Sequence, residues 1–129
     1  VVVIAAPTER PQLQNLFDHF PAGSVLDASF TTLPEAACLC QLADVCVAND
    51  SGLAHLAAAT GQPTVVLFGP MDEAVYRPLG PQVTVLTAPT VGPADNPFPP
   101  QLKPRPLGGL LPATVWQAMQ PLLAQRKVA

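Results

Sequence analysis

Over residues 1–88 the chain alternates between short runs typical of buried strands and runs with helical spacing. The strand-like runs lie at residues 1–6, 24–27, 45–48, 64–68 and 82–86. A strand, a helix and a further strand at this spacing form a right-handed crossover, which makes the strands parallel and places helices against the sheet. The alternation therefore predicts an α/β domain, built as a parallel sheet with helices on both faces.

The helical runs carry their own start and stop signals. Apolar residues between 13 and 20 repeat at helical spacing after Pro11. Thr32 and Glu35 fit a capping box for a helix that runs to about residue 42. A helix over 53–60 should end at Gly61, which suits a left-handed cap. A terminal helix is expected over 114–126, kinked or shortened by Pro121.

Prolines determine the organisation of the last third of the chain. Eight of the 17 prolines fall between residues 89 and 112. Such a stretch forms neither a helix nor a central strand, and is typical of a linker or a functional loop. The predicted organisation is a core over residues 1–88, a proline-rich connection over 89–111 and a C-terminal helix over 112–129.

Composition and charge exclude several classes of protein. With 49% apolar and 12% charged residues, intrinsic disorder is excluded for most of the chain. No apolar run has the length of a membrane span, and the first residues lack the layout of a signal peptide. The net charge is −3, and no broad basic face indicates a nucleic-acid partner. A basic cluster near the end is interpreted as a solvated terminus, with an anionic membrane surface or an acidic partner as the alternative. Its members are Lys103, Arg105, Arg126 and Lys127.

Three cysteines, Cys38, Cys40 and Cys46, lie in apolar surroundings. An odd number without a secretion signal indicates a reducing compartment. On a helix, Cys38 and Cys40 point about 200° apart, so they are not expected to share a metal ion. All three are therefore predicted to be buried structural cysteines, and no metal site is expected.

The turn after residues 45–48 is the strongest candidate for a binding site. It places Asp50, Ser51 and Gly52 at the start of an alanine-rich helix, with His55 in the first turn of that helix. Free amides and the positive end of the helix dipole favour an anion there, and Gly52 lets it approach the backbone. Together these residues predict a pyrophosphate site without a lysine. The alternative is an ordinary N-cap beside a surface histidine.

Two common nucleotide-binding motifs are absent from the sequence. No G-x-G-x-x-G follows any strand-like run, and no G-K-[ST] occurs. These absences argue against nicotinamide-dependent enzymes and P-loop NTPases.

The same region resembles the donor half of the family 9 glycosyltransferases, the lipopolysaccharide heptosyltransferases and their relatives. Residues 43–59 read A-D-V-C-V-A-N-D-S-G-L-A-H-L-A-A-A, and residues 61–70 read G-Q-P-T-V-V-L-F-G-P, followed by Asp72. The family pattern is a strand, N-D-[ST]-G-x-x-H-L-A-A-A, a G-x-P turn, a second strand and F-G-P-x-D. Residues 5–10 resemble its G-G-P-x-E segment, with alanines in place of both glycines. Residues 32–35 resemble its S-L-x-E helix start.

The resemblance implies a GT-B fold, in which two Rossmann-like domains face each other, and it identifies this chain with the C-terminal one. That domain binds a nucleotide-sugar, commonly ADP-heptose. By resemblance, Ser51, Gly52 and His55 would hold the diphosphate, and Asp50 would contact sugar hydroxyls or order the turn. The remaining donor contacts would be Glu9 with the ribose, and Thr31 and Thr32 with the base. A solvated loop acid is the alternative for Glu9, and helix capping alone accounts for Thr32.

The resemblance also sets expectations for the complete enzyme. The chain begins after the family's first strand and helix of this domain, and catalytic residues are expected in the N-terminal domain of the same enzyme. Alone, the chain should be inactive. It should need no cofactor or metal, and the enzyme should be cytoplasmic or peripheral at the inner membrane.

Two other interpretations remain open at this point. One is a non-catalytic nucleotide-sugar-binding or interaction domain of the same fold, favoured by the replaced glycines near Glu9 and by the long proline segment. The other is a sugar-nucleotide epimerase of similar two-domain architecture. A second Rossmann half upstream with an early acid would favour the transferase.

Overall fold

The structure, a computed structural model, describes residues 1–126 and divides the chain into two compact units. The first comprises Val1–Leu39, and the second begins at Cys40. Every strand pairing in the described residues is parallel, which confirms the predicted α/β class. The strands form two hydrogen-bonded groups, β1 with β2 and β3 with β4 and β5.

The first unit is built on one short strand pair. Strand β1 (Val2–Val3) pairs with β2 (Leu26–Asp27), and between them lie a 3-10 helix η1 (Pro7–Leu13) and helix α1 (Gln14–His19). The apolar run 1–6 predicted a longer strand. Only its first half is paired among the described residues, because β2 offers two partners and the chain turns into η1 at Pro7.

Helix α2 (Leu33–Leu42) begins with the predicted capping box. The Glu35 carboxylate accepts a hydrogen bond from the Thr32 amide at 2.7 Å, and the Thr32 hydroxyl accepts one from the Glu35 amide at 3.4 Å. The bond from the Thr32 amide is the main reason why the pKa of Glu35 lies below its usual value. The boundary between the two units falls within this helix.

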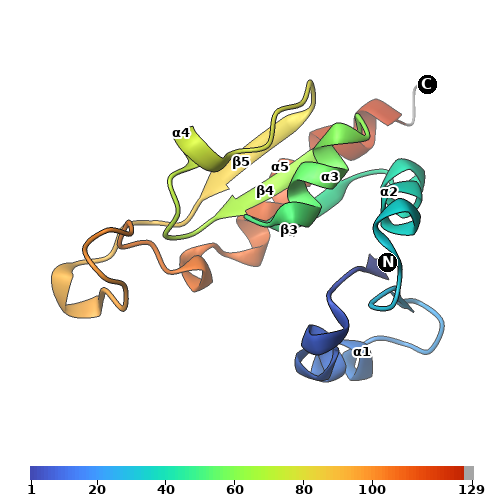
Figure 1. The fold of residues 1–129 in the computed structure, drawn as a ribbon, viewed down its shortest axis with the longest axis horizontal. Helices are drawn as coiled ribbons and strands as arrows, with labels where there is room; N and C mark the ends of the chain where they lie inside the picture. The colour runs from blue at the N-terminus through green and yellow to red at the C-terminus, as the bar shows by residue number, and fades with distance from the viewer. Residues whose placement is uncertain (127–129) are drawn as a thin grey trace. The chain divides into compact units, whose positions relative to one another are not determined.

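The second unit contains a three-stranded sheet with β4 (Thr64–Phe68) in the centre, between β3 (Cys46–Asn49) and β5 (Val83–Thr87). Helix α3 (Gly52–Ala59) packs against β3 and β4, and α5 (Pro112–Arg126) contacts β4. Figure 1 shows α3 in front of this sheet and α5 behind it. Because neighbouring residues on a strand point to opposite faces, the full burial of both Val65 and Val66 shows that both faces of β4 are covered.

The core of this unit lies under α3. Its central residues are Ala54, Val66 and Phe68, with Met71 among the side chains packed around them. Small alanines on α3 allow the helix to approach the sheet closely, and Ala54, Ala57 and Ala58 are all buried. Gly61 then adopts the predicted left-handed conformation, with φ of 80°.

Several details of the sequence prediction are corrected. The proline-rich stretch contains two short 3-10 helices, η2 (Pro93–Asp95) and η3 (Leu107–Gly109). Helix α5 is not shortened at Pro121, since it continues to Arg126; the last three residues predicted to belong to it lie outside the described residues. Cys40 is buried as predicted, but Cys38 is exposed, because its side chain lies on the outer side of α2. None of the helices described is long and apolar enough to span a membrane.

Candidate functional site

The turn between β3 and α3 leaves the sheet at its carboxyl edge, as predicted. The Asp50 amide donates a hydrogen bond to the Leu67 carbonyl at 3.1 Å, which ties the turn to the end of the neighbouring strand β4. Parallel α/β sheets bind ligands at this edge. The register, with Asn49 opposite Leu67, therefore places the start of α3 where a ligand is expected.

The N-terminus of α3 is open. Ser51 is the N-cap residue, yet its hydroxyl accepts no hydrogen bond from an amide of the first turn in the described chain. Apart from its chain neighbours and the backbone of its own helix, no described atom lies within 4 Å of the position that a Cβ atom would occupy on Gly52, which is itself exposed. The first amides of a helix have no partner within the helix. The structure therefore does not contain an ordinary cap by the Ser51 hydroxyl, which was one form of the alternative interpretation.

His55 lies on the same helix, one turn from this open end, and is exposed. The preceding residue, Ala54, is fully buried against the sheet, so the imidazole projects on the outer side of α3. The structure thus brings together four of the predicted site residues, Asp50, Ser51, Gly52 and His55, at one helix terminus. The backbone amides, one hydroxyl and one imidazole can all donate hydrogen bonds to an anion.

The other three predicted residues belong to the first unit. Glu9 is exposed, and its Oε2 accepts a hydrogen bond from the Ala6 amide at 2.8 Å. The Thr31 hydroxyl donates to the Ala28 carbonyl at 2.8 Å. Thr32 caps α2, as described above. Each of these side chains therefore has a local structural role in the unit that contains it.

Thr31 also lines a shallow hollow on the first unit. The other residues around this hollow come from the first turns of α2, and they are Pro34, Glu35, Cys38 and Leu39. Most of these groups are apolar, so the hollow suits a flat, weakly polar group better than a charged one.

A second polar cluster in the first unit escaped the sequence analysis. Arg10 pairs through its Nε with Asp27, and its guanidinium lies 4.4 Å from the centre of the Phe17 ring. Asp27 also accepts a hydrogen bond from the Ser29 hydroxyl at 2.6 Å, and this bond is the main cause of its lowered pKa. The cluster connects η1 and α1 to the end of β2, so its role in this unit is structural.

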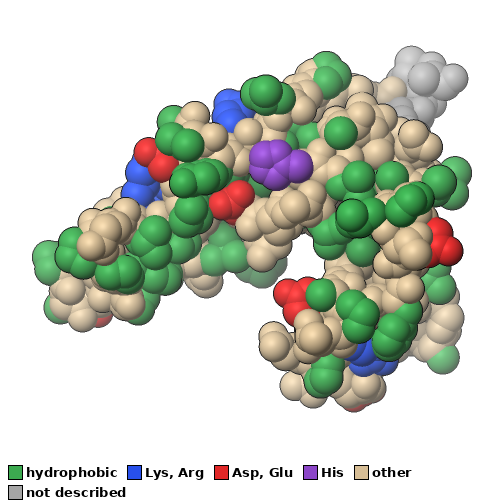
Figure 2. Space-filling model, viewed as in Figure 1, with side chains coloured by type: hydrophobic (Ala, Val, Ile, Leu, Met, Phe, Trp, Pro, Cys, Tyr) green, Lys and Arg blue, Asp and Glu red, His purple; other side chains and the backbone are tan. Residues whose placement is uncertain are grey.

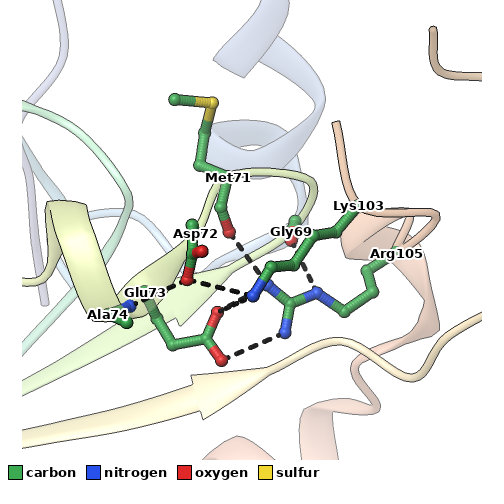
Figure 3. A network of polar contacts seen from close by, with 7 residues as sticks. All are labelled: Gly69, Met71, Asp72, Glu73, Ala74, Lys103 and Arg105. Atoms are coloured by element: carbon green, nitrogen blue, oxygen red, sulfur yellow. Dashed lines mark hydrogen bonds and ion pairs between the residues drawn. The ribbon is translucent and has the colours of Figure 1, made fainter. Parts of the chain in front are cut away.

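A larger network in the second unit holds the loop after β4, and Figure 3 shows it from close by. Arg105 is buried, and its guanidinium forms two hydrogen bonds with the Glu73 carboxylate, at 2.6 and 3.3 Å. Lys103 lies 3.0 Å from Asp72, which also caps the short helix α4 (Glu73–Tyr76). The bonds from Arg105 lower the pKa of Glu73 from 4.5 to about 2.

This network corrects the interpretation of the basic cluster as a solvated terminus. Lys103 and Arg105 are ion-paired within the unit, whereas Lys127 lies outside the described residues. The sequence offered one weak signal: two adjacent acids at 72 and 73, and two cations at 103 and 105. Nothing in local spacing connects segments thirty residues apart. No group of three or more metal-ligating side chains occurs in the part of the chain that the structure describes.

Comparison with known proteins places these features in context. Residues 1–96 match the family model of glycosyltransferase family 9 (heptosyltransferase). Over 59 residues the chain is 39% identical to lipooligosaccharide heptosyltransferase 2 of Haemophilus influenzae. That match covers 46% of this chain and 17% of the relative, so the chain corresponds to a small part of that protein.

Solved structures share the fold. The family 9 glycosyl transferase of Veillonella parvula is 21% identical with a TM-score of 0.80, over 96% of this chain and 36% of that one. The E. coli ADP-heptose lipopolysaccharide heptosyltransferase II is 24% identical with a TM-score of 0.80, over 98% of this chain and 37% of that one. An E. coli heptosyltransferase with ADP has a TM-score of 0.72 at 24% identity, over 92% of this chain and 32% of that one.

Proposed function

Because the chain belongs to glycosyltransferase family 9, the heptosyltransferases, we propose that it is the donor-binding part of a heptosyltransferase-like enzyme. The donor would be a nucleotide-sugar resembling ADP-heptose, used in the synthesis of lipopolysaccharide or a related glycan. The names of the similar proteins support this assignment, since they include an ADP-heptose heptosyltransferase and a heptosyltransferase with ADP.

The observation that carries the proposal is the open N-terminus of α3. The Ser51 hydroxyl caps no amide of the first turn, although the Ser51 carbonyl accepts a hydrogen bond from the Ala54 amide at 3.1 Å. Beyond its chain neighbours and its own helix backbone, Gly52 has no described atom within 4 Å of the position of a Cβ atom. A diphosphate there would accept hydrogen bonds from the amides, the Ser51 hydroxyl and the His55 imidazole. Asp50 would contact sugar hydroxyls or order the turn.

For three residues of the first unit, we propose the roles that the family resemblance implies. One oxygen of Glu9 is bound to the Ala6 amide, and the other would accept hydrogen bonds from ribose hydroxyls. Thr31 and Thr32 would lie near the base, for which the hollow lined by Thr31 is suited. In this proposal residues 1–88 form the nucleotide-sugar-binding core, 89–111 the connection and 112–129 the C-terminal helix.

Catalysis would require the N-terminal domain of the same enzyme. That domain would deprotonate an acceptor hydroxyl, while the helix terminus and His55 stabilise the departing nucleoside diphosphate. These groups would carry the charge that a divalent metal ion balances in other transferases. We place the complete enzyme in the cytoplasm or peripherally at the inner membrane, and we expect this chain alone to be inactive.

Thermal unfolding with nucleotides tests the proposal. At a concentration of one hundred times Kd, a ligand that binds only the folded state stabilises it by about 2.7 kcal/mol. ADP and ADP-sugars should raise the melting temperature of the chain, whereas inorganic sulfate at the same ionic strength should not. If no nucleoside diphosphate or nucleotide-sugar does so, the assignment as a donor-binding part is wrong.

A further inference from the structure

The proline-rich segment contacts three successive carbonyl groups of the turn that follows β4. The Gly69 carbonyl accepts a hydrogen bond from Arg105 Nε at 3.2 Å, and the Met71 carbonyl accepts one from Arg105 Nη2 at 2.9 Å. Between them, the Pro70 carbonyl accepts a bond from the Lys103 amide at 2.9 Å. Two residues of a distant segment thus hold this stretch of backbone, as Figure 3 shows for the Arg105 contacts.

The two segments are closely packed. A Cβ atom on Gly69 would lie 3.2 Å from the Arg105 carbonyl oxygen, so a larger residue there would push the segments apart. Arg105 is 7% exposed although it carries a charge. Removing one partner of such a buried, hydrogen-bonded charge is costly, because the other groups lose their compensation. The guanidinium therefore fixes the turn strongly.

The turn that Arg105 holds is connected to the proposed diphosphate site through the core of the unit and through β4. Met71 packs against the core cluster of Ala54, Val66 and Phe68, and Ala54 lies in the first turn of α3. The turn also continues from β4, whose Leu67 carbonyl binds the Asp50 amide. A shift of residues 69–73 would therefore reach the start of α3 through packing and through the end of β4.

We infer that Arg105 is a positioning residue for donor binding: by holding the Gly69–Glu73 turn, it sets the position of the α3 N-terminus that receives the diphosphate. The inference rests on the proposed function. Arg105 itself touches no ligand in this scheme, and it acts through Met71 and the core beneath α3.

The test compares Arg105→Gln with Arg77→Gln in the full chain, using calorimetric titration with ADP. Arg77 is exposed and its side chain has no ion pair in the described chain, so it is a matched control. Coupling through a packed network changes binding by about threefold to thirtyfold. We expect Arg105→Gln to weaken ADP binding within that range and Arg77→Gln to leave it unchanged.

A double-mutant cycle separates positioning from general loss of stability. If Arg105 acts through Met71, then Arg105→Gln should weaken ADP binding much less in a Met71→Ala background than in the parent. Arg105→Lys keeps the charge beside Glu73 but lacks the planar guanidinium, whose separate nitrogens bind the Gly69 and Met71 carbonyls. Its affinity for ADP should therefore lie between those of the parent and Arg105→Gln. This variant also serves if Arg105→Gln does not fold.

The outcomes distinguish the two claims. If the parent binds ADP and Arg105→Gln binds it equally well, the positioning role is wrong and the proposed function stands. If the losses in Arg105→Gln and Met71→Ala simply add, Arg105 does not act through Met71, and the inference also fails. If the parent itself does not bind ADP, the proposed function fails and this inference fails with it.

Discussion

At Gly52, the structure separates an effect on binding from an effect on folding. Because a Cβ placed there would have no atom within 4 Å beyond its chain neighbours and its own helix backbone, Gly52→Val should change the free energy of unfolding little. The valine side chain would nevertheless occupy the space that a phosphate needs. We expect the stabilisation by ADP to be abolished, measured as the loss of the shift in melting temperature.

Gly92→Val is the matched control. A Cβ atom on Gly92 would likewise have no described atom within 4 Å beyond its chain neighbours, and the residue has a negative φ of −67°, but it lies in the proline-rich segment. This variant should retain the full ADP-induced shift. An equal response of both variants would place the anion somewhere other than the start of α3.

His55 should contribute to donor binding as a hydrogen-bond donor. It is exposed one turn from the open end of α3, where its imidazole can donate to a phosphate oxygen. We therefore expect His55→Ala to weaken ADP binding. Calorimetric titration with ADP measures the effect.

The control for His55 is His19→Ala. His19 is exposed on α1, where its Nδ1 lies 2.7 Å from the Asn15 carbonyl oxygen. Its removal should leave the affinity for ADP unchanged. An equal loss of affinity in both variants would contradict the role proposed for His55.

Among the structural elements, the loop after β4 should respond most clearly to acid. Arg105 holds the pKa of Glu73 at about 2, compared with 4.5 for the free side chain. Because the pKa of Glu73 is lower in the folded state than in the unfolded state, its ionised carboxylate stabilises the fold at pH values above 4.5. This stabilisation is lost as the pH falls from 4.5 towards 2. Glu73→Gln should therefore be less stable than the parent at pH 7, and the difference should shrink on acidification.

Urea denaturation at a series of pH values measures this difference. Asp95→Asn is the control, because Asp95 is exposed in the short helix η2. The urea concentration at the unfolding midpoint should decrease by the same amount in Asp95→Asn as in the parent over this pH range. A constant difference between Glu73→Gln and the parent down to pH 2 would contradict the role assigned to the Arg105 pair.

Elements whose signals are local could be predicted from the sequence. The bounds of β4, the capping box of α2 and the left-handed Gly61 all depend on residues within a few positions of one another. The open end of α3 was predicted as a site, but only the structure shows that Ser51 does not cap it. Sequence patterns predict which amides are available, whereas side-chain rotamers decide whether they are used.

Features that depend on distant segments could not be predicted. Arg105 was interpreted as a solvated charge because its partners lie 32 to 36 positions away. The pairing of β1 with β2 apart from the other strands likewise depends on tertiary contacts, since the apolar run 1–6 has the composition of a longer strand. Local periodicity contains no information on either.

At the scale of the whole molecule, stability should differ between the two units. Strand β4 is buried on both faces and paired on both sides, while β1 and β2 have two residues each. Burial and pairing set the free energy of local opening, so β4 should open less readily than β1 and β2.

Apolar side chains remain exposed in both units. Figure 2 shows several of them in the region of α4, where Val75, Tyr76 and Leu79 are exposed.

Native-state hydrogen exchange should reflect this difference. We expect the amides of β4 to exchange slowest in the chain and those of β1 and β2 to exchange orders of magnitude faster. The amides of α3 should lie near those of β4, because Ala54, Ala57 and Ala58 are buried against the sheet. Uniform protection across both units would show that they open as a single cooperative body.

The hydrogen bonds of Arg105 also have a consequence for the nascent chain. Its carbonyl partner in Gly69 is 36 positions earlier, and ribosomes add about 5 to 20 residues per second. The loop after β4 is thus made about two to seven seconds before the arginine that holds it. Strands β3 and β4 and helix α3 are made before that interval and β5 during it, all without the hydrogen bonds from Arg105, so a diphosphate site would be completed only when translation has passed residue 105.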